Sequence, residues 1–218
     1  MSCATCSVGN CAALRGEFPE FCLTVNAPPG KVEEVIGRYL RSPKDKKMSL
    51  TAADIESRWY GRATRVEETL IFIKNMGYKK VGVATCFGLL RECNMFARVA
   101  KAKGVDVYGV ACKVGAVDKT VIGLKEEQKI RPGTHESMCN PILQAELLNE
   151  AQTDLNVIIG LCVGHDSLFI KHSKAPVTYL IVKDRVLCHN PAAALYLSLP
   201  SGYYSRLLGP ELPEPRAE

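Results

Sequence analysis

The stretch that decides the fold is Val81-Gly82-Val83-Ala84-Thr85-Cys86, a short apolar run that ends in cysteine. Two other runs have the same form, VYGVAC at residues 107–112 and VIIGLC at residues 157–162. Continuous apolar runs of this length are typical of strands that are buried on both faces. Because helical patterns separate them, the sequence predicts an α/β domain with a mostly parallel sheet between two helix layers, Rossmann-like or flavodoxin-like.

The segments around these runs carry helix signals, such as the Asn140-Pro141 and Asn190-Pro191 pairs that combine a capping residue with proline at the first helical position. We expect helices at about 32–40, 51–76 (with Gly61 as a point of division), 89–103, from 141, near 166 and from 191. Residues 177–182 and 186–188 are interpreted as a hairpin that turns at Lys183-Asp184. Residues 113–138 form a long connection between predicted elements, which we call the excursion, and the sequence pattern predicts no structure for it.

Three regions follow from this pattern. The first is a cysteine-rich segment at 1–25, the second is the α/β domain at 31–208, and the third is a Pro- and Glu-rich tail at 209–218 that is expected to be disordered.

Composition limits the class of protein. With 47% apolar and 23% charged residues, the chain can form a core without disulfides. The net charge of +5 is small and scattered, so nucleic acid is not an expected partner. No apolar stretch is long enough to span a membrane, and the first residues lack the features of a secretory signal. We therefore expect a cytoplasmic protein with no membrane partner.

Cysteine is the unusual component, with ten residues in the chain. Four of them form a C-x2-C-x4-C-x10-C pattern: Cys3, Cys6, Cys11 and Cys22. Such clustering in a chain without a signal sequence is typical of metal ligation or redox chemistry. Structural zinc sites usually combine two close pairs, and here only one pair is close, so the spacing favours an iron–sulfur cluster over zinc as the cofactor.

A second set of cysteines follows the apolar runs. Cys86, Cys112 and Cys162 each end one run, and ligands of open α/β sheets bind at the carboxyl ends of the strands. Cys139 directly precedes the Asn140 cap, where a helix N-terminus favours a thiolate. These four residues are predicted to form one metal or catalytic thiolate site. Cys93 and Cys188 are interpreted as ordinary cysteines.

Polar residues adjoin these cysteines. Lys113 follows Cys112 and is a candidate to neutralise a thiolate or to hold an anionic substrate. His165 lies three residues after Cys162, in a segment that opens a helix, and is a candidate to move a proton. Neither a G-x-G-x-x-G after a strand nor a P-loop is present, which excludes the standard dinucleotide and P-loop sites. Asp184-Arg185 is interpreted as part of a turn.

Several segments together resemble a known group of proteins: Cys86-Phe87-Gly88-Leu89, Cys112-Lys113-Val114-Gly115, Met138-Cys139-Asn140-Pro141, residues 160–166 (GLCVGHD) and Lys183-Asp184-Arg185. The chain is similar over nearly its whole length to an uncharacterised, cysteine-rich family of predicted metal-binding proteins of archaea and anaerobic bacteria. That resemblance implies metal binding and groups Cys86, Cys112, Cys139 and Cys162 as one set. It implies no reaction.

Two hypotheses of function remain. In the first, the protein is an enzyme whose strand-end thiolates bind a metal or cluster with an open position and act on a small anionic or sulfur-containing substrate. Cys86, Cys112 and Cys162 are then ligands, and Cys139 is a fourth ligand or a nucleophile. In the second, it is a binding protein that holds structural zinc and senses, stores or delivers metal. A thiol–disulfide enzyme is a third interpretation, and it is disfavoured because the C-x-x-C lies in a loop before any strand.

Overall fold

The computed structural model describes residues 1–212 and 214, and its chain divides into two compact units, Met1–Asp54 and Ile55–Glu218. Each unit is considered by itself. The predicted disordered tail at 209–218 lies partly outside the described residues. In the part of the chain that is described, no helix is long and apolar enough to cross a membrane.

The second unit contains a four-stranded sheet in which all neighbouring strands are parallel. Its strands are β1 (Lys80–Thr85), β2 (Asp106–Ala111), β3 (Leu155–Ile159) and β4 (Val177–Ile181), in the order β2-β1-β3-β4. The central strands β1 and β3 are almost wholly buried, as their continuous apolar sequences require. The prediction of an α/β fold with a parallel sheet is confirmed.

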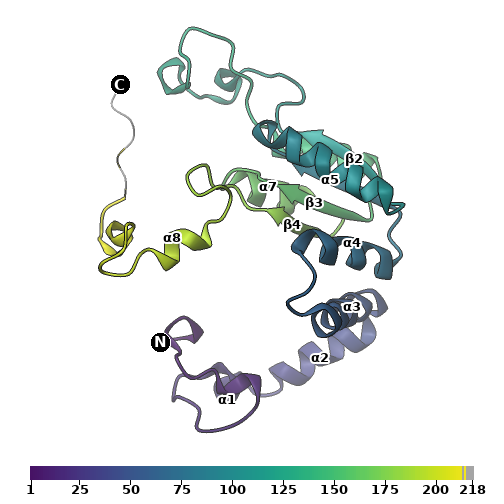
Figure 1. Ribbon diagram of the computed structural model, residues 1–218, viewed down its shortest axis with the longest axis vertical. Coiled ribbons are helices and arrows are strands. Elements are labelled where there is room, and N and C mark those ends of the chain that lie inside the picture. Colours follow the sequence, from purple (N-terminus) through teal and green to yellow (C-terminus); the bar gives the residue numbers. More distant parts are fainter. Residues whose placement is uncertain (213, 215–218) are drawn as a thin grey trace. The chain divides into compact units, whose positions relative to one another are not determined.

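Helices flank the sheet on both faces (Figure 1). Gly82 of β1 faces Leu148 of helix α6 (Pro141–Glu150). Gly82 and Thr85 are three positions apart on β1, so their side-chain directions lie on opposite faces of the sheet. The Thr85 hydroxyl donates to the carbonyl of Leu89, just before α5 (Leu90–Ala102). The buried core lies between these layers, and Phe169 of α7 (His165–His172) is fully buried in it.

Several helix ends match their sequence signals. Asn140 accepts a hydrogen bond from the amide of Leu143 at the start of α6, with Pro141 at the first helical position. The expected long helix is divided at Gly61, which has φ of 66°, into α3 (Pro43–Trp59) and α4 (Arg65–Met76). Thr64 and Glu67 form a capping box at the start of α4. The predicted start of the last α-helix is wrong by one residue: α8 spans Ala192–Tyr196, Pro191 is its N-cap, and no side chain caps it.

One predicted element is wrong. Residues 177–182 and 186–188 do not form a hairpin, because β4 pairs in parallel with β3 and residues 186–188 form turns. The side chain of Asp184 accepts hydrogen bonds from the amides of Val186 and Leu187, which coils this segment instead of extending it.

The excursion at residues 113–138 forms a loop with two short 3-10 helices, Lys119–Ile122 and Glu126–Gln128 (Figure 1). The amine of Lys129, whose side chain is 4% exposed, lies 3.0 Å from Asp118 and 2.9 Å from Glu126. At the base of the loop the amide of Asn140 donates to the carbonyl of Cys112 at 2.8 Å. The excursion is thus ordered internally and leaves and rejoins the sheet at neighbouring points.

The first unit is helical and contains α1 (Leu23–Asn26), α2 (Lys31–Arg41) and most of α3. Two 3-10 turns, Cys3–Thr5 and Asn10–Ala12, precede these helices. None of the residues of α1 or α2 is buried, and the apolar residues of α2 are exposed.

Candidate functional site

Two of the predicted cysteines lie side by side at the carboxyl edge of the sheet. Thr85 of β1 pairs with Ala111 of β2, so the next residues, Cys86 and Cys112, occupy the same level. The ladder continues through them, because the Cys112 amide donates to the Thr85 carbonyl at 2.9 Å. Cys86 and Cys112 are 9% and 2% exposed, so the sulfur atoms lie at the border between core and surface.

Cys139 joins them from the base of the excursion. The hydrogen bond from the Asn140 amide to the Cys112 carbonyl fixes this segment against the end of β2. Cys112 is a close neighbour of both Cys86 and Cys139, so its thiol can hydrogen-bond to either sulfur atom. We refer to Cys86, Cys112 and Cys139 as the cysteine triad.

The triad separates two acidic thiols from one that retains its proton. The hydrogen bond from Cys112 and the ammonium of Lys183 lower the pKa of Cys86 below the ordinary cysteine value. The hydrogen bond from Cys112, together with the charges of Lys113 and His165, lowers the pKa of Cys139. Its two sulfur neighbours and burial raise the pKa of Cys112. The site therefore combines two thiols of lowered pKa with one of raised pKa.

Backbone and lysine groups donate to the sulfur atoms. The amide of Phe87 lies 3.2 Å from Cys112 Sγ, and the amine of Lys183 lies 2.6 Å from Cys86 Sγ. Such donors stabilise negative charge on sulfur in a partly buried site.

Cys162 lies farther from the level of Cys86 and Cys112 than its place at the end of an apolar run suggests. β3 ends at Ile159, which pairs with Thr85, so Gly160 occupies the level of Cys86 and Cys162 lies two residues beyond it. Gly160 has φ of 64° and turns the chain away from the strand direction. The predicted equivalence of the three strand-end cysteines therefore holds for Cys86 and Cys112 and is wrong by two residues for Cys162. The Arg185 guanidinium lies 3.1 Å from Cys162 Sγ.

Lys183 and Arg185 are site residues that the sequence interpretation missed. They were assigned to a turn, and Asp184 between them does form one. In the sequence, the segment Lys183-Asp184-Arg185 contributes only to the resemblance to a family, and the family profile that matches the chain ends at residue 180, before this segment.

The two polar candidates, Lys113 and His165, lie at this edge. Lys113 donates to the carbonyl of Ser137, beside Cys139. His165 begins α7, and its Nδ1 atom is buried without a hydrogen-bond partner among the described residues. The charges of both side chains act on Cys139, which makes them suitable to orient an anion and to move a proton there.

Buried polar residues behind the site fix these elements. Gln144 of α6, 1% exposed, donates to the carbonyls of Thr85 and Val110, next to the triad. Tyr179 donates to Asp166 Oδ2 at 2.8 Å, and Asp166 Oδ1 accepts from the amides of Gly164 and Ser167. These contacts tie β4 to the segment that carries Cys162 and His165.

The other predicted ligands lie in the first unit. Cys3, Cys6 and Cys11 are exposed, and Cys22 is partly exposed at the cap of α1. Hydrogen bonds from Thr24 lower the pKa of Cys22. Within residues 1–212 and 214, no three His, Cys, Asp or Glu side chains are arranged as a ready ligand set for a metal ion. Metal binding by either cysteine set stays a prediction.

The remaining cysteines take no part in the triad. Cys93 is buried in α5, where burial raises its pKa, and Cys188 is exposed.

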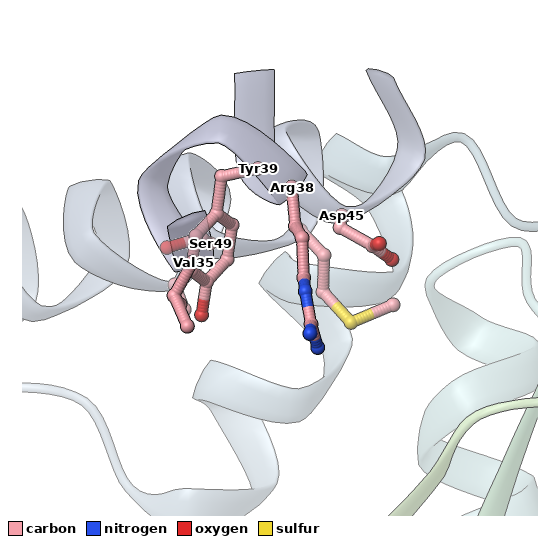
Figure 2. A pocket seen from close by; sticks show the side chains of 7 residues that line it. Val35, Arg38, Tyr39, Asp45 and Ser49 are labelled. Carbon is pink, nitrogen blue, oxygen red and sulfur yellow. The ribbon is translucent and has the colours of Figure 1, made fainter. Parts of the chain in front are cut away.

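A pocket of about 500 Å³ lies between α2 and α3 (Figure 2). Val35, Arg38 and Tyr39 line it from α2, and it contains none of the predicted site residues. The triad is accordingly the candidate site.

Comparison with known proteins supports the resemblance to an uncharacterised family, but it does not test metal binding. The profile of a family described as "Protein of unknown function (DUF1847)" matches residues 22–180. The "Uncharacterized protein MJ0455" of Methanocaldococcus jannaschii is 49% identical over 164 residues, which cover 75% of this chain and 82% of that protein. The span matched by the family profile includes every residue of the triad together with Lys113, Cys162 and His165.

Proposed function

Because the chain belongs to the DUF1847 family of proteins of unknown function, we propose its activity from the site alone: the protein is an enzyme of redox or sulfur chemistry that acts through the cysteine triad. The observation that carries this proposal is the grouping of Cys86, Cys112 and Cys139 at one edge of the sheet, where strand register and the backbone hydrogen bond from Asn140 to Cys112 bring them together. Thiolates are the nucleophiles of sulfur chemistry, and a neighbouring proton donor allows a bound product to leave.

The surrounding residues have separate roles in this proposal. Cys139 is the nucleophile, since it is partly exposed whereas Cys86 and Cys112 are buried. Lys113 neutralises charge on the substrate next to Cys139, and His165 moves a proton through its unpartnered Nδ1. Lys183 keeps Cys86 as a thiolate. The expected substrate is a small anionic or sulfur-containing molecule.

The second candidate function is metal binding, through Cys86, Cys112, Cys139 and Cys162, and independently through Cys3, Cys6, Cys11 and Cys22. The donor set favours it, because thiolates are ligands of zinc and of iron–sulfur clusters and the Phe87 amide donates to Cys112 Sγ as amides do to metal-bound thiolates. A bound metal would hold these thiolates deprotonated and, with an open position, would supply a Lewis acid. We place it second because the described side chains form no ready ligand set. In this form the protein senses, stores or delivers metal.

The test compares metal content with thiol reactivity on protein purified without oxygen. If the triad is a thiol site, iodoacetamide should modify Cys139 much faster than the exposed Cys188, and metal and acid-labile sulfide should be far below stoichiometric. A stoichiometric metal that is lost in Cys86→Ser and protects Cys139 from alkylation would favour the second candidate. Loss of metal in Cys11→Ser alone would assign it to the first unit and leave the triad as a thiol site.

A further inference from the structure

The sulfur atoms of the site are surrounded by positive charge. Lys183 Nζ lies 2.6 Å from Cys86 Sγ and an Arg185 nitrogen lies 3.1 Å from Cys162 Sγ. The Lys113 amine donates to the carbonyl of Ser137, two residues before Cys139, and so places a cation beside that cysteine. Electrostatic attraction at such an edge favours an anionic ligand, and it favours most a reaction that releases an anion.

Several backbone amides near the sulfur atoms already donate to other groups. Those of Gly164 and Ser167 donate to Asp166 Oδ1, those of His165 and Asp166 donate to the Cys162 carbonyl, and that of Phe87 donates to Cys112 Sγ. Attack on an acyl carbon needs such amides to stabilise an oxyanion. Displacement at sulfur needs no oxyanion hole, because the leaving group carries the charge away and side-chain cations stabilise it.

We propose, on the basis of the function given above, that the substrate is a small anion carrying sulfane sulfur, that Cys139 accepts this sulfur atom, and that Cys112 releases it as sulfide. The partly exposed Cys139 can meet an anion from solvent. Cys112 is 2% exposed and lies beside the segment of Cys139, so it can resolve an intermediate on Cys139 but is shielded from a substrate in solvent.

The steps balance for thiosulfate, the simplest probe of this class. The Cys139 thiolate attacks the outer sulfur, the sulfur–sulfur bond breaks, and sulfite leaves with the bonding electron pair, which gives a Cys139 persulfide. Cys112 then attacks Sγ of Cys139 and loses its proton, and the outer sulfur leaves with that proton as hydrosulfide. The product is a Cys112–Cys139 disulfide, and an external dithiol reduces it for the next turnover.

The experiment is a single turnover of the full chain, purified without oxygen, with thiosulfate and no dithiol. Wild type should release sulfite and sulfide in equal amounts and should contain a Cys112–Cys139 disulfide by peptide mapping. Cys112→Ser should release sulfite but no sulfide, and should retain one additional sulfur atom on Cys139. Cys139→Ser should release neither product, and Cys188→Ser, a cysteine outside the triad, should match wild type.

Lys113→Met keeps all the cysteines, and it tests the same site in case the cysteine variants fail to fold. It should form the same products with sulfite released about tenfold more slowly, because the cation beside the leaving group is lost. If wild type releases no sulfite while Cys139 still alkylates faster than Cys188, the sulfane-sulfur inference is wrong and the proposed thiol function stands. If Cys139 is also no more reactive than Cys188, both fail.

Discussion

Lys183 Nζ lies 2.6 Å from Cys86 Sγ, although Lys183 follows the edge strand β4 and Cys86 follows the central strand β1. The lysine therefore reaches past the end of β3, which lies between those strands. This contact joins two parts of the chain that are 97 positions apart, and it makes Cys86 dependent on the segment after β4.

Replacing Lys183 with methionine tests that dependence. The hydrogen bond from Cys112 and the Lys183 ammonium lower the pKa of Cys86 to about 4, so removing the ammonium should raise this pKa toward the ordinary cysteine value and lower the thiolate fraction at mildly acidic pH. The ultraviolet thiolate absorbance of the chain, titrated without oxygen, measures this. Lys171→Met, at an exposed position of α7, is the matched control. Superimposable titrations of wild type and Lys183→Met would contradict the assignment.

Tyr179→Phe tests the tie between β4 and α7. The variant loses one hydrogen bond to Asp166, which should lower the free energy of unfolding by about 1 kcal/mol at neutral pH. Burial and the Asp166 carboxylate raise the pKa of Tyr179 to about 12. Because the folded state holds the phenol proton more tightly, this contribution is complete below the ordinary tyrosine pKa of about 10 and declines as pH rises toward 12.

Urea denaturation at neutral pH and at several pH values from about 10 upward measures the stability difference for Tyr179 across the range in which it should decline. A phenol titration should in addition show one late-ionising tyrosine fewer in the variant. A difference between the two proteins that grows with rising pH would show that the sign is wrong.

Gly82→Ala tests the packing of β1 against α6. An added Cβ would lie 2.1 Å from Asn156 Oδ1 and 3.0 Å from a methyl carbon of Leu148, and both side chains are fully buried. The free energy of unfolding should fall by about 2 to 3 kcal/mol. Gly88→Ala is the control, since its nearest neighbour is Cys86 Sγ at 3.9 Å, and it should change stability by less than about 0.5 kcal/mol. Equal effects in chemical denaturation would refute this packing.

Asp118→Asn tests the order of the excursion. Hydrogen bonds from the amides of Thr120 and Glu136 hold the pKa of Asp118 well below its usual range. A carboxyl with a depressed pKa stabilises the fold above its ordinary pKa of about 4, and this is lost only as pH falls through the lower, folded value. In wild type these two amides should stay protected from hydrogen exchange at a pH slightly below 4.

The asparagine variant should lose that protection at every pH, because it removes the negative charge beside the buried Lys129 amine. Lys125→Met, at a surface lysine of the same loop, should exchange like wild type. Protection that is unchanged in Asp118→Asn would mean that the loop is held by other contacts.

The sequence predicted the sheet well because the signals are local. The buried strands are continuous apolar runs, and Asn140-Pro141 identifies the start of α6 without ambiguity. It predicted β4 but not its partner, since residues 177–188 contain both an apolar run and a turn, as a hairpin would. The parallel pairing of β4 with β3 is a tertiary contact, which no local sequence pattern predicts.

The site was predicted less completely, for a related reason. That Cys86 and Cys112 share one edge follows from their positions at strand ends. The register of β3 does not follow, because the run at residues 157–162 continues past the strand end at Ile159. Lys183 and Arg185 were missed because long side chains reach sulfur atoms across the sheet, a relation that no local pattern encodes.

The closed base of the excursion has a consequence for engineering. The chain departs after Cys112 and returns at Cys139, where one backbone hydrogen bond joins the two ends, so the sulfur positions do not depend on how the chain travels between them. The cost of closing a loop grows only slowly with its length. A reporter domain inserted between the exposed Val121 and Ile122 would therefore preserve the arrangement of the cysteines at the sheet edge.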